Sequence, residues 1–186
     1  LRTLGLCGKV RLPVYGSAVD HTREGPRTEK AMIQGTVEAI YITARGGTKM
    51  ERVVEVGALA GLGLKGDRYC LGTGYWTGVD ECQLTLIAAE DLDEILKTTG
   101  VRVGDGEHRR NLVTRGVRLG DLSGRTFQVG QGGLEYDRPR PPCGYIESLT
   151  QPRMTRALGR RAGICARVVK SGWIRARDPI ALVLGD

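Results

Sequence analysis

Apolar and polar residues alternate along many short segments of this chain, beginning with Val37, Ala39 and Tyr41. A period of two over roughly four to eight residues is typical of strands that bury one face. Further segments of this kind, separated by glycine-rich turns, are residues 53–56, 84–88, 110–114, 125–129, 133–136, 164–170, 173–175 and 180–184. So many short strands, together with 28 glycines, predict a mainly β fold, either a barrel or a sandwich.

Two segments break this alternation and predict helices. In residues 89–99, Leu92, Ile95 and Leu96 follow helical spacing, and Gly100 ends the helix. Residues 152–161 begin on a proline suited to a first helical turn. Their apolar stripe is narrow, so we expect this helix to lie on the surface. A third short helix is expected to begin after Cys143.

Length and hydropathy place the chain in one domain. A chain of 186 residues suits a single core, and no apolar stretch approaches the ~20 residues needed to span a bilayer. Residues 1–33 are poorly periodic and are expected to form an arm, with residues 34–186 as the barrel domain. The N-terminus has neither the apolar core of a secretory signal nor an initiator methionine, which suggests a truncated or processed chain.

The five cysteines, at positions 7, 70, 82, 143 and 165, form no CxxC pair and leave one over. This number argues against a disulfide framework and favours a reducing cytoplasm. We interpret Cys70, Cys82 and Cys165 as structural. With only two histidines and no paired-cysteine motif, a zinc site is not expected.

The net charge of +7 is unevenly distributed along the chain. Residues 1–100 hold 12 Lys/Arg and 13 Asp/Glu, whereas residues 101–186 hold 16 and 8. Because a guanidinium donates two parallel hydrogen bonds to a phosphate, the arginines of the second half are candidates for anion binding. For Arg153, Arg156, Arg160 and Arg161 a solvated basic helix face is the better interpretation.

Cys143 is the main candidate for chemistry. It follows Arg138-Pro139-Arg140-Pro141-Pro142, so a rigid proline frame and two arginines precede the thiol. Cations lower the pKa of a thiol, and the thiolate is the form that attacks electrophiles and binds metals. The alternative is a small buried apolar side chain after a turn. Cys–His catalysis, with His21 or His108 as the base, also stays open.

A glycine-rich segment, Gly61-Leu62-Gly63-Leu64-Lys65-Gly66, matches GxGxxG after a predicted strand. No apolar helix follows it, so a dinucleotide-binding fold is not expected. Backbone N–H groups of such a loop can still bind an anion, with Lys65 and Arg68 supplying charge and Asp67 orienting Arg68. The alternative is an ordinary turn with a surface ion pair.

Arg109-Arg110-Asn111 enters a predicted strand. Strand alternation should place Arg109 and Asn111 on one face and Arg110 on the other. One amide, with a donor and an acceptor for a ring edge, and one arginine, suited to a phosphate, would then point the same way. The alternative, Asn111 as a turn residue, is weakened by the apolar pair that follows it.

Three motifs in this order resemble the MOSC domain, named for the C-terminal domain of molybdenum cofactor sulfurase. They are Gly66-Asp67-Arg68, then Arg109-Arg110-Asn111-Leu112-Val113-Thr114, then the Arg/Pro-rich stretch that ends at Cys143. The resemblance covers roughly residues 35–184, and consistent order makes it more specific than any single motif. It implies a MOSC-type β-barrel with two or three short helices.

The resemblance also implies function. It implies binding of molybdenum cofactor (molybdopterin), with Cys143 as the thiolate ligand to molybdenum and as the catalytic residue. The implied cofactor-binding residues are Lys65, Gly66, Asp67, Arg68, Arg109, Arg110, Asn111, Arg138 and Arg140. By similarity to amidoxime-reducing members, we expect an oxidoreductase that reduces N-hydroxylated small molecules, with electrons from a separate partner. Neither a nucleic acid nor a membrane is an expected partner.

Some features leave alternatives open. Where stand-alone relatives carry a His-Gly-Gly element, this chain has Gly72-Thr73-Gly74-Tyr75-Trp76, so its pocket wall and substrate preference differ. A non-catalytic carrier of cofactor, or of persulfide sulfur received from a cysteine desulfurase, is the alternative function. A basic RNA-binding barrel is less favoured, because the nine aromatic residues form no stacking run.

Overall fold

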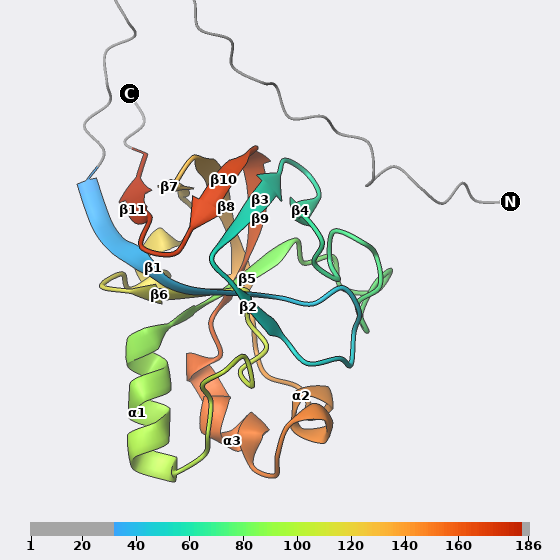
Figure 1. The fold of residues 1–186 in the computed structure, drawn as a ribbon. Coiled ribbons are helices and arrows are strands. Elements are labelled where there is room, and N and C mark those ends of the chain that lie inside the picture. The colour runs from blue at the N-terminus through green and yellow to red at the C-terminus, as the bar shows by residue number, and fades with distance from the viewer. Residues whose placement is uncertain (1–31, 184–186) are drawn as a thin grey trace, which may run out of the picture.

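The computed structural model describes residues 32–183, which form a closed β-barrel with the helices gathered on one side (Figure 1). Seven strands follow one another in the order β11, β7, β8, β9, β5, β6 and β1, and β1 pairs back onto β11. The barrel strands are β1 (Met32–Ile42), β5 (Leu84–Ala88), β6 (Leu112–Arg115), β7 (Thr126–Val129), β8 (Gly132–Pro139), β9 (Ile164–Lys170) and β11 (Pro179–Leu182). The expectation of a mainly β barrel with two or three short helices is confirmed.

One strand pair in the barrel is parallel, and its crossover contains the first helix. β5 and β6 run parallel, whereas the other neighbouring barrel strands are antiparallel. A parallel pair needs a long crossover. Here the crossover is α1 (Ala89–Thr99) and the loop that carries residues 100–111. The expected bounds of this helix, 89–99, are confirmed.

A second sheet packs beside the barrel. It contains β10 (Gly172–Arg175), β3 (Glu55–Leu59) and β4 (Gly63–Leu64), while β2 (Glu51–Val53) extends the barrel sheet at β1. The single strand expected over residues 53–56 is therefore wrong, because the chain bends at exposed Val54 and changes sheets. The GxGxxG segment, residues 61–66, forms the turn that leads into β4, then β4 itself and the turn after it. The expectation that no helix follows it is confirmed.

The core has two parts. The barrel interior is filled by residues such as Leu84, Leu86 and Phe127. A second cluster, which includes Ile87 and Met154, lies between the barrel wall and the helices. Consequently all five residues of β5 are buried, and the expectation of a half-buried strand fails there.

The short helices are α2 (Gly144–Leu149) and α3 (Met154–Leu158), the latter continued by a 3₁₀ turn, Gly159–Arg161. Another 3₁₀ turn spans Leu119–Leu122. The expected surface position of the helix in residues 152–161 is wrong. Its stripe is narrow, yet Met154 and Leu158 are fully buried against the second cluster.

Cys82 and Cys165 form a disulfide across 83 residues of sequence. Both were expected to be structural, but without a bridge, so the argument against disulfides is wrong for this pair. With an odd number of cysteines, not all of them can be paired, but one bridge between two of them is still possible.

Most of the expected N-terminal arm, residues 1–33, lies outside the described residues. Met32 and Ile33 begin β1 and pair with β11, so the barrel starts before residue 34. Over residues 32–183, no helix is long and apolar enough to cross a membrane.

Candidate functional site

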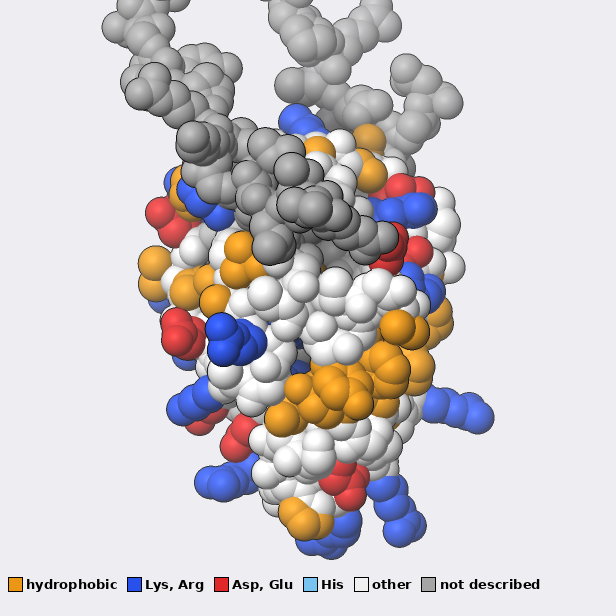
Figure 2. Space-filling model, turned by 90° about the vertical axis from the view of Figure 1, so that its right-hand side faces the viewer, with side chains coloured by type: hydrophobic (Ala, Val, Ile, Leu, Met, Phe, Trp, Pro, Cys, Tyr) orange, Lys and Arg blue, Asp and Glu red, His pale blue; other side chains and the backbone are white. Residues whose placement is uncertain are grey.

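A cavity of about 300 Å³ opens between the loop after β4, the turn before β6 and the segment after β8. It brings together Arg68, Arg109, Arg110, Arg140 and Cys143, which come from three separate parts of the sequence. Figure 2 looks at the side that lies on the right in Figure 1 and shows hydrophobic side chains gathered beside a hollow. The cavity unites five of the residues that the motifs predicted.

Cys143 sits at the cavity wall immediately before α2. Its thiol is free and half-buried. Its carbonyl accepts hydrogen bonds from the Ile146 backbone N–H (3.1 Å) and the Thr155 hydroxyl (3.3 Å), which restrain the main chain of the residue that carries the sulfur. Pro141 and Pro142 line the cavity beside it. The thiol is thus held on a restrained backbone and faces a cavity.

Arg110 is almost fully buried and is held by main-chain carbonyls. Its Nε donates to Ala162 O (2.6 Å), Nη1 to His108 O (3.4 Å) and Nη2 to Arg140 O (3.3 Å). Burial lowers the pKa of Arg110 to about 10, and the positive charges of Arg140 and Arg68 add to this shift. A buried guanidinium that has no carboxylate beside it in the described part of the chain favours the approach of an anion.

Arg109 has two unused donor nitrogens at the cavity. Its Nη1 donates to Thr48 O (2.6 Å), and its other two guanidinium nitrogens, Nε and Nη2, make no hydrogen bond within the described part of the chain. Burial, together with the charge of Arg68, lowers the pKa of Arg109. Among residues 32–183, neither Arg109 nor Arg110 lies within ion-pair distance of a carboxylate.

Arg140 and Arg68 are each paired with a carboxylate. Arg140 and Arg138 both bond to Asp80. Burial alone would raise the pKa of Asp80, but the hydrogen bonds and charges of the two arginines outweigh it and lower the pKa. Arg68 is paired with Asp67 at 3.1 Å, as expected, and its guanidinium lies 4.4 Å from the centre of the Tyr69 ring. Of the four cavity arginines, therefore, Arg68 is paired with Asp67 and Arg140 with Asp80, and the other two have no carboxylate partner among residues 32–183.

The expectation for Asn111 is wrong. Asn111 is fully buried and does not line the cavity; instead its side chain joins Thr85, Tyr41 and Asp67. Strand alternation failed because β6 begins only at Leu112. Arg109 has a left-handed backbone with φ of 58°, which turns the chain so that Arg109 and Arg110 both reach the cavity.

Four other predicted residues do not line the cavity. Asp67 is fully buried behind Arg68. Lys65 is exposed and packs over Gly57, while Gly66 occupies the turn after β4 with φ of 81°. Arg138 bonds to Asp80 and Asp137 and lines a neighbouring cavity.

His108 is also separated from Cys143. Its Nδ1 accepts a hydrogen bond from the Arg110 backbone N–H (3.0 Å), and its ring lines a different cavity, beside α1. The geometry therefore does not favour His108 as a base for Cys143. His21 lies outside the described residues.

Aromatic residues form part of the cavity wall; residues 72–76 were expected to alter the pocket wall, but no role for Tyr75, Trp76 or Tyr145 was predicted. Tyr75 stacks on Tyr145 with ring centres 3.8 Å apart, and Trp76 meets Tyr75 edge-on at 5.0 Å. Although stacked, Tyr75 remains 59% exposed. The adjacent Tyr75-Trp76 pair was visible in the sequence, but only the fold places Tyr145 opposite it. Asp80 carried no local signal.

The comparisons with known proteins agree with this architecture. The model of the MOSC domain matches residues 73–181, more than half of the chain. This protein therefore belongs to the MOSC domain family. No curated protein sequence matches it.

Three solved structures share the fold. YuaD from Bacillus subtilis is 21% identical, with a TM-score of 0.66 over 82% of this chain and 97% of that protein. YiiM from Geobacillus stearothermophilus is 17% identical, with a TM-score of 0.62 over 81% and 75% of the two chains. YiiM from Escherichia coli is 20% identical, with a TM-score of 0.58 over 81% and 70%.

Proposed function

We propose that this protein binds molybdenum cofactor in the Cys143 cavity and there reduces N-hydroxylated small molecules. One observation carries the proposal: a free thiol shares a cavity with four arginines, two of which have no carboxylate partner in the described residues. This combination suits a ligand with a thiophilic metal at one end and a phosphate at the other.

The residues present fit such a cofactor. A thiolate is a soft ligand that suits a redox metal, and guanidinium groups suit a phosphate. Over residues 32–183, no group of three or more His, Cys, Asp or Glu side chains could hold a metal ion. The protein would then supply one metal ligand, Cys143, and the remaining ligands would come from the cofactor.

The chain's own residues would bind and orient. Arg109 would donate its unused N–H groups to the phosphate, with Arg110 and Arg140 adding positive charge. The aromatic wall of Tyr75, Trp76 and Tyr145 would exclude water from the centre. When bound, the molybdenum supplies a two-electron oxygen-atom transfer. Reduction of an N-hydroxylated substrate consumes two electrons and two protons and yields the N–H compound and water, so a separate electron-transfer protein must supply the electrons.

The test is metal retention by Cys143→Ser protein produced in a cofactor-competent host. A hydroxyl is a harder and much less acidic ligand than a thiol, so molybdenum content should fall to background while the fold is kept. Cys70→Ser, which changes the other cysteine of residues 32–183 that lies outside the Cys82–Cys165 bridge, is the matched control and should keep its metal. Equal molybdenum in Cys143→Ser and parent protein would contradict the proposal.

A sulfur carrier is the second candidate, favoured by the free, half-exposed thiol of Cys143. A carrier would accept sulfur from a separate cysteine desulfurase and gain the mass of one sulfur atom on Cys143. Holo protein with a chemical reductant should instead reduce an amidoxime or N-hydroxylated purine. Turnover by cofactor-free protein, or none by fully loaded protein, would overturn the preference for an enzyme.

A further inference from the structure

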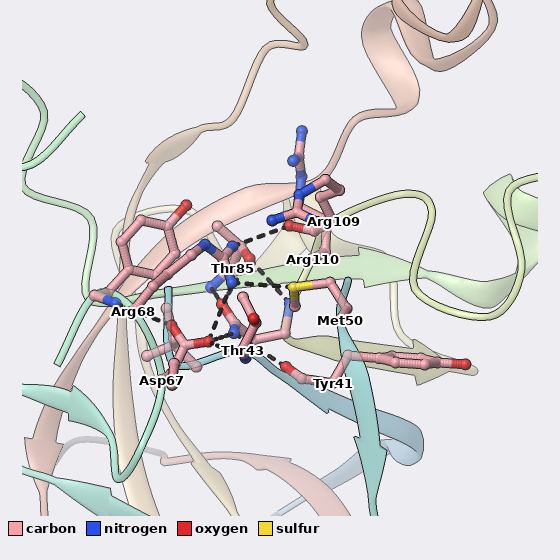
Figure 3. A network of polar contacts seen from close by, with 12 residues as sticks. Tyr41, Thr43, Met50, Asp67, Arg68, Thr85, Arg109 and Arg110 are labelled. Carbon is pink, nitrogen blue, oxygen red and sulfur yellow. Dashed lines mark hydrogen bonds and ion pairs between the residues drawn. The ribbon is translucent and has the colours of Figure 1, made fainter. Parts of the chain in front are cut away.

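A buried polar chain connects two of the sequence motifs behind the cavity (Figure 3). It begins at Thr85 on β5, passes through Asn111 and Asp67, and ends at Arg68 on the cavity wall. The first three residues are fully buried, and Arg68 is 5% exposed. Thr85, Asn111 and the adjacent pair Asp67-Arg68 come from three separate parts of the sequence, so only the fold assembles the chain.

Asn111 has no capacity left for a ligand. Its Oδ1 accepts hydrogen bonds from the Thr85 backbone N–H (3.1 Å) and hydroxyl (2.9 Å). Its Nδ2 donates to Tyr41 O (3.1 Å) and to Asp67 Oδ1 (3.0 Å). A side-chain amide has two acceptor and two donor positions, and all four are used.

Asp67 transmits this restraint to Arg68. Its Oδ1 also accepts from the Thr43 backbone N–H (3.2 Å) and from Arg68 Nη1 (3.1 Å), and its Oδ2 accepts from the Tyr69 backbone N–H (3.1 Å). With this many donors the carboxylate has a single orientation. Arg68 Nη1 further contacts Met50 Sδ (3.2 Å), and Nη2 donates to Arg109 O (3.2 Å). Of the five N–H groups of Arg68, two remain for a ligand in the cavity.

We infer that Asn111 is a positioning residue, which orients the anion-binding guanidinium of Arg68 through Asp67 and does not touch the ligand. The inference rests on the proposed anion site of the cavity. An oriented guanidinium loses less entropy when it binds a phosphate, so loosening it should weaken binding. A shorter side chain at position 111 would leave Asp67 without one donor and free to turn, and Arg68 would turn with it.

The experiment is a double-mutant cycle with inorganic phosphate as the probe, followed by phosphorus NMR titration. Asn111→Ser should weaken phosphate binding by about tenfold in the otherwise unchanged protein, as is typical when a residue behind a ligand is removed. In the Arg68→Gln background the same change should have less than about a twofold effect, because it then has no guanidinium to orient. Thr85→Ala removes the hydroxyl that donates to Asn111 Oδ1 and should also weaken phosphate binding. It replaces Asn111→Ser in the cycle if that variant does not fold.

Thr114→Val is the matched control. Thr114 is equally buried on β6 and its hydroxyl bonds to Ile87 O, but it belongs to no contact with Arg68. It should lower stability and leave the phosphate affinity unchanged. Equal effects of Asn111→Ser in the two Arg68 backgrounds would overturn the inference while the anion site stands. No phosphate binding by the parent protein would overturn the anion site itself, and this inference with it.

Discussion

Acidification should destabilise this protein through His108. Its side chain is 1% exposed, and its Nε2 is the one buried side-chain nitrogen or oxygen of residues 32–183 without a hydrogen-bond partner. Burial, with smaller contributions from the charges of Arg110 and Arg109, lowers the pKa of His108 from 6.5 to about 3. Because Nδ1 accepts the Arg110 backbone hydrogen bond, Nε2 carries the hydrogen of the neutral ring. A second proton would have to bind Nδ1 and break that hydrogen bond, so protonation favours the unfolded chain.

The magnitude follows from linkage. Below pH 6.5 the unfolded state binds a proton that the folded state does not, so this contribution is complete above pH 6.5 and is lost as the pH falls toward 3. One pKa unit corresponds to about 1.4 kcal/mol, so the free energy of unfolding should fall by about 2 kcal/mol between pH 7 and pH 5. Asp80 has a lowered pKa and loses its contribution below that window.

Urea unfolding of parent and His108→Asn protein at both pH values measures the effect. Asparagine cannot titrate and can still accept the Arg110 backbone hydrogen bond at the position of Nδ1. The variant should be less stable at neutral pH because it leaves a small cavity, but its stability should change about 2 kcal/mol less between the two pH values. The comparison also cancels His21, which both proteins contain. Parallel pH dependence in the two proteins would refute the reasoning.

The remaining predictions concern the cavity and the disulfide. Arg109→Gln should weaken phosphate binding by ~1–3 kcal/mol with little change in Tm, because its unused donors serve the ligand. Arg110→Gln should weaken phosphate binding and also lower Tm, because three buried carbonyls lose their donor. If both leave the affinity measured by titration unchanged, the anion site lies elsewhere on the protein. A reductant should lower the stability of the parent by ~2–4 kcal/mol through the Cys82–Cys165 bridge, and thermal melts of the Cys82→Ala/Cys165→Ala double variant should not respond to it. If the reductant also leaves the melting temperature of the parent protein unchanged, no bridge forms.

Local patterns predicted some elements well. The helix over residues 89–99 was predictable because spacing, charge and a glycine stop agree, and Gly100 adopts the left-handed C-cap, with φ of 67°. The strand over residues 164–170 was predicted with its full bounds. The burial of Met154 and Leu158 was not predictable. The apolar stripe of this helix is narrow, and its burial depends on packing against the barrel wall and the other helices, which come from distant parts of the sequence.

The site divides in the same way. Arg68, Arg109, Arg110, Arg140 and Cys143 were candidates by residue type, and all five line one cavity. The roles within the motifs were not predictable from spacing. The positive φ of Arg109 changes the directions of the side chains that strand alternation had predicted. The amide of Asn111 bonds to other residues of the buried interior and not to a ligand.

The sequence by itself determined the mainly β class, the first helix and the residue types that carry the chemistry, because these depend on periodicity and on side chains over short distances. The tertiary structure decided barrel closure through β1 and β11, the disulfide, and which motif residues face the cavity. Each of these depends on contacts between residues far apart in the chain. Whether a polar side chain is available to a ligand is decided by how many of its hydrogen bonds the fold has already used, and no local pattern records that number.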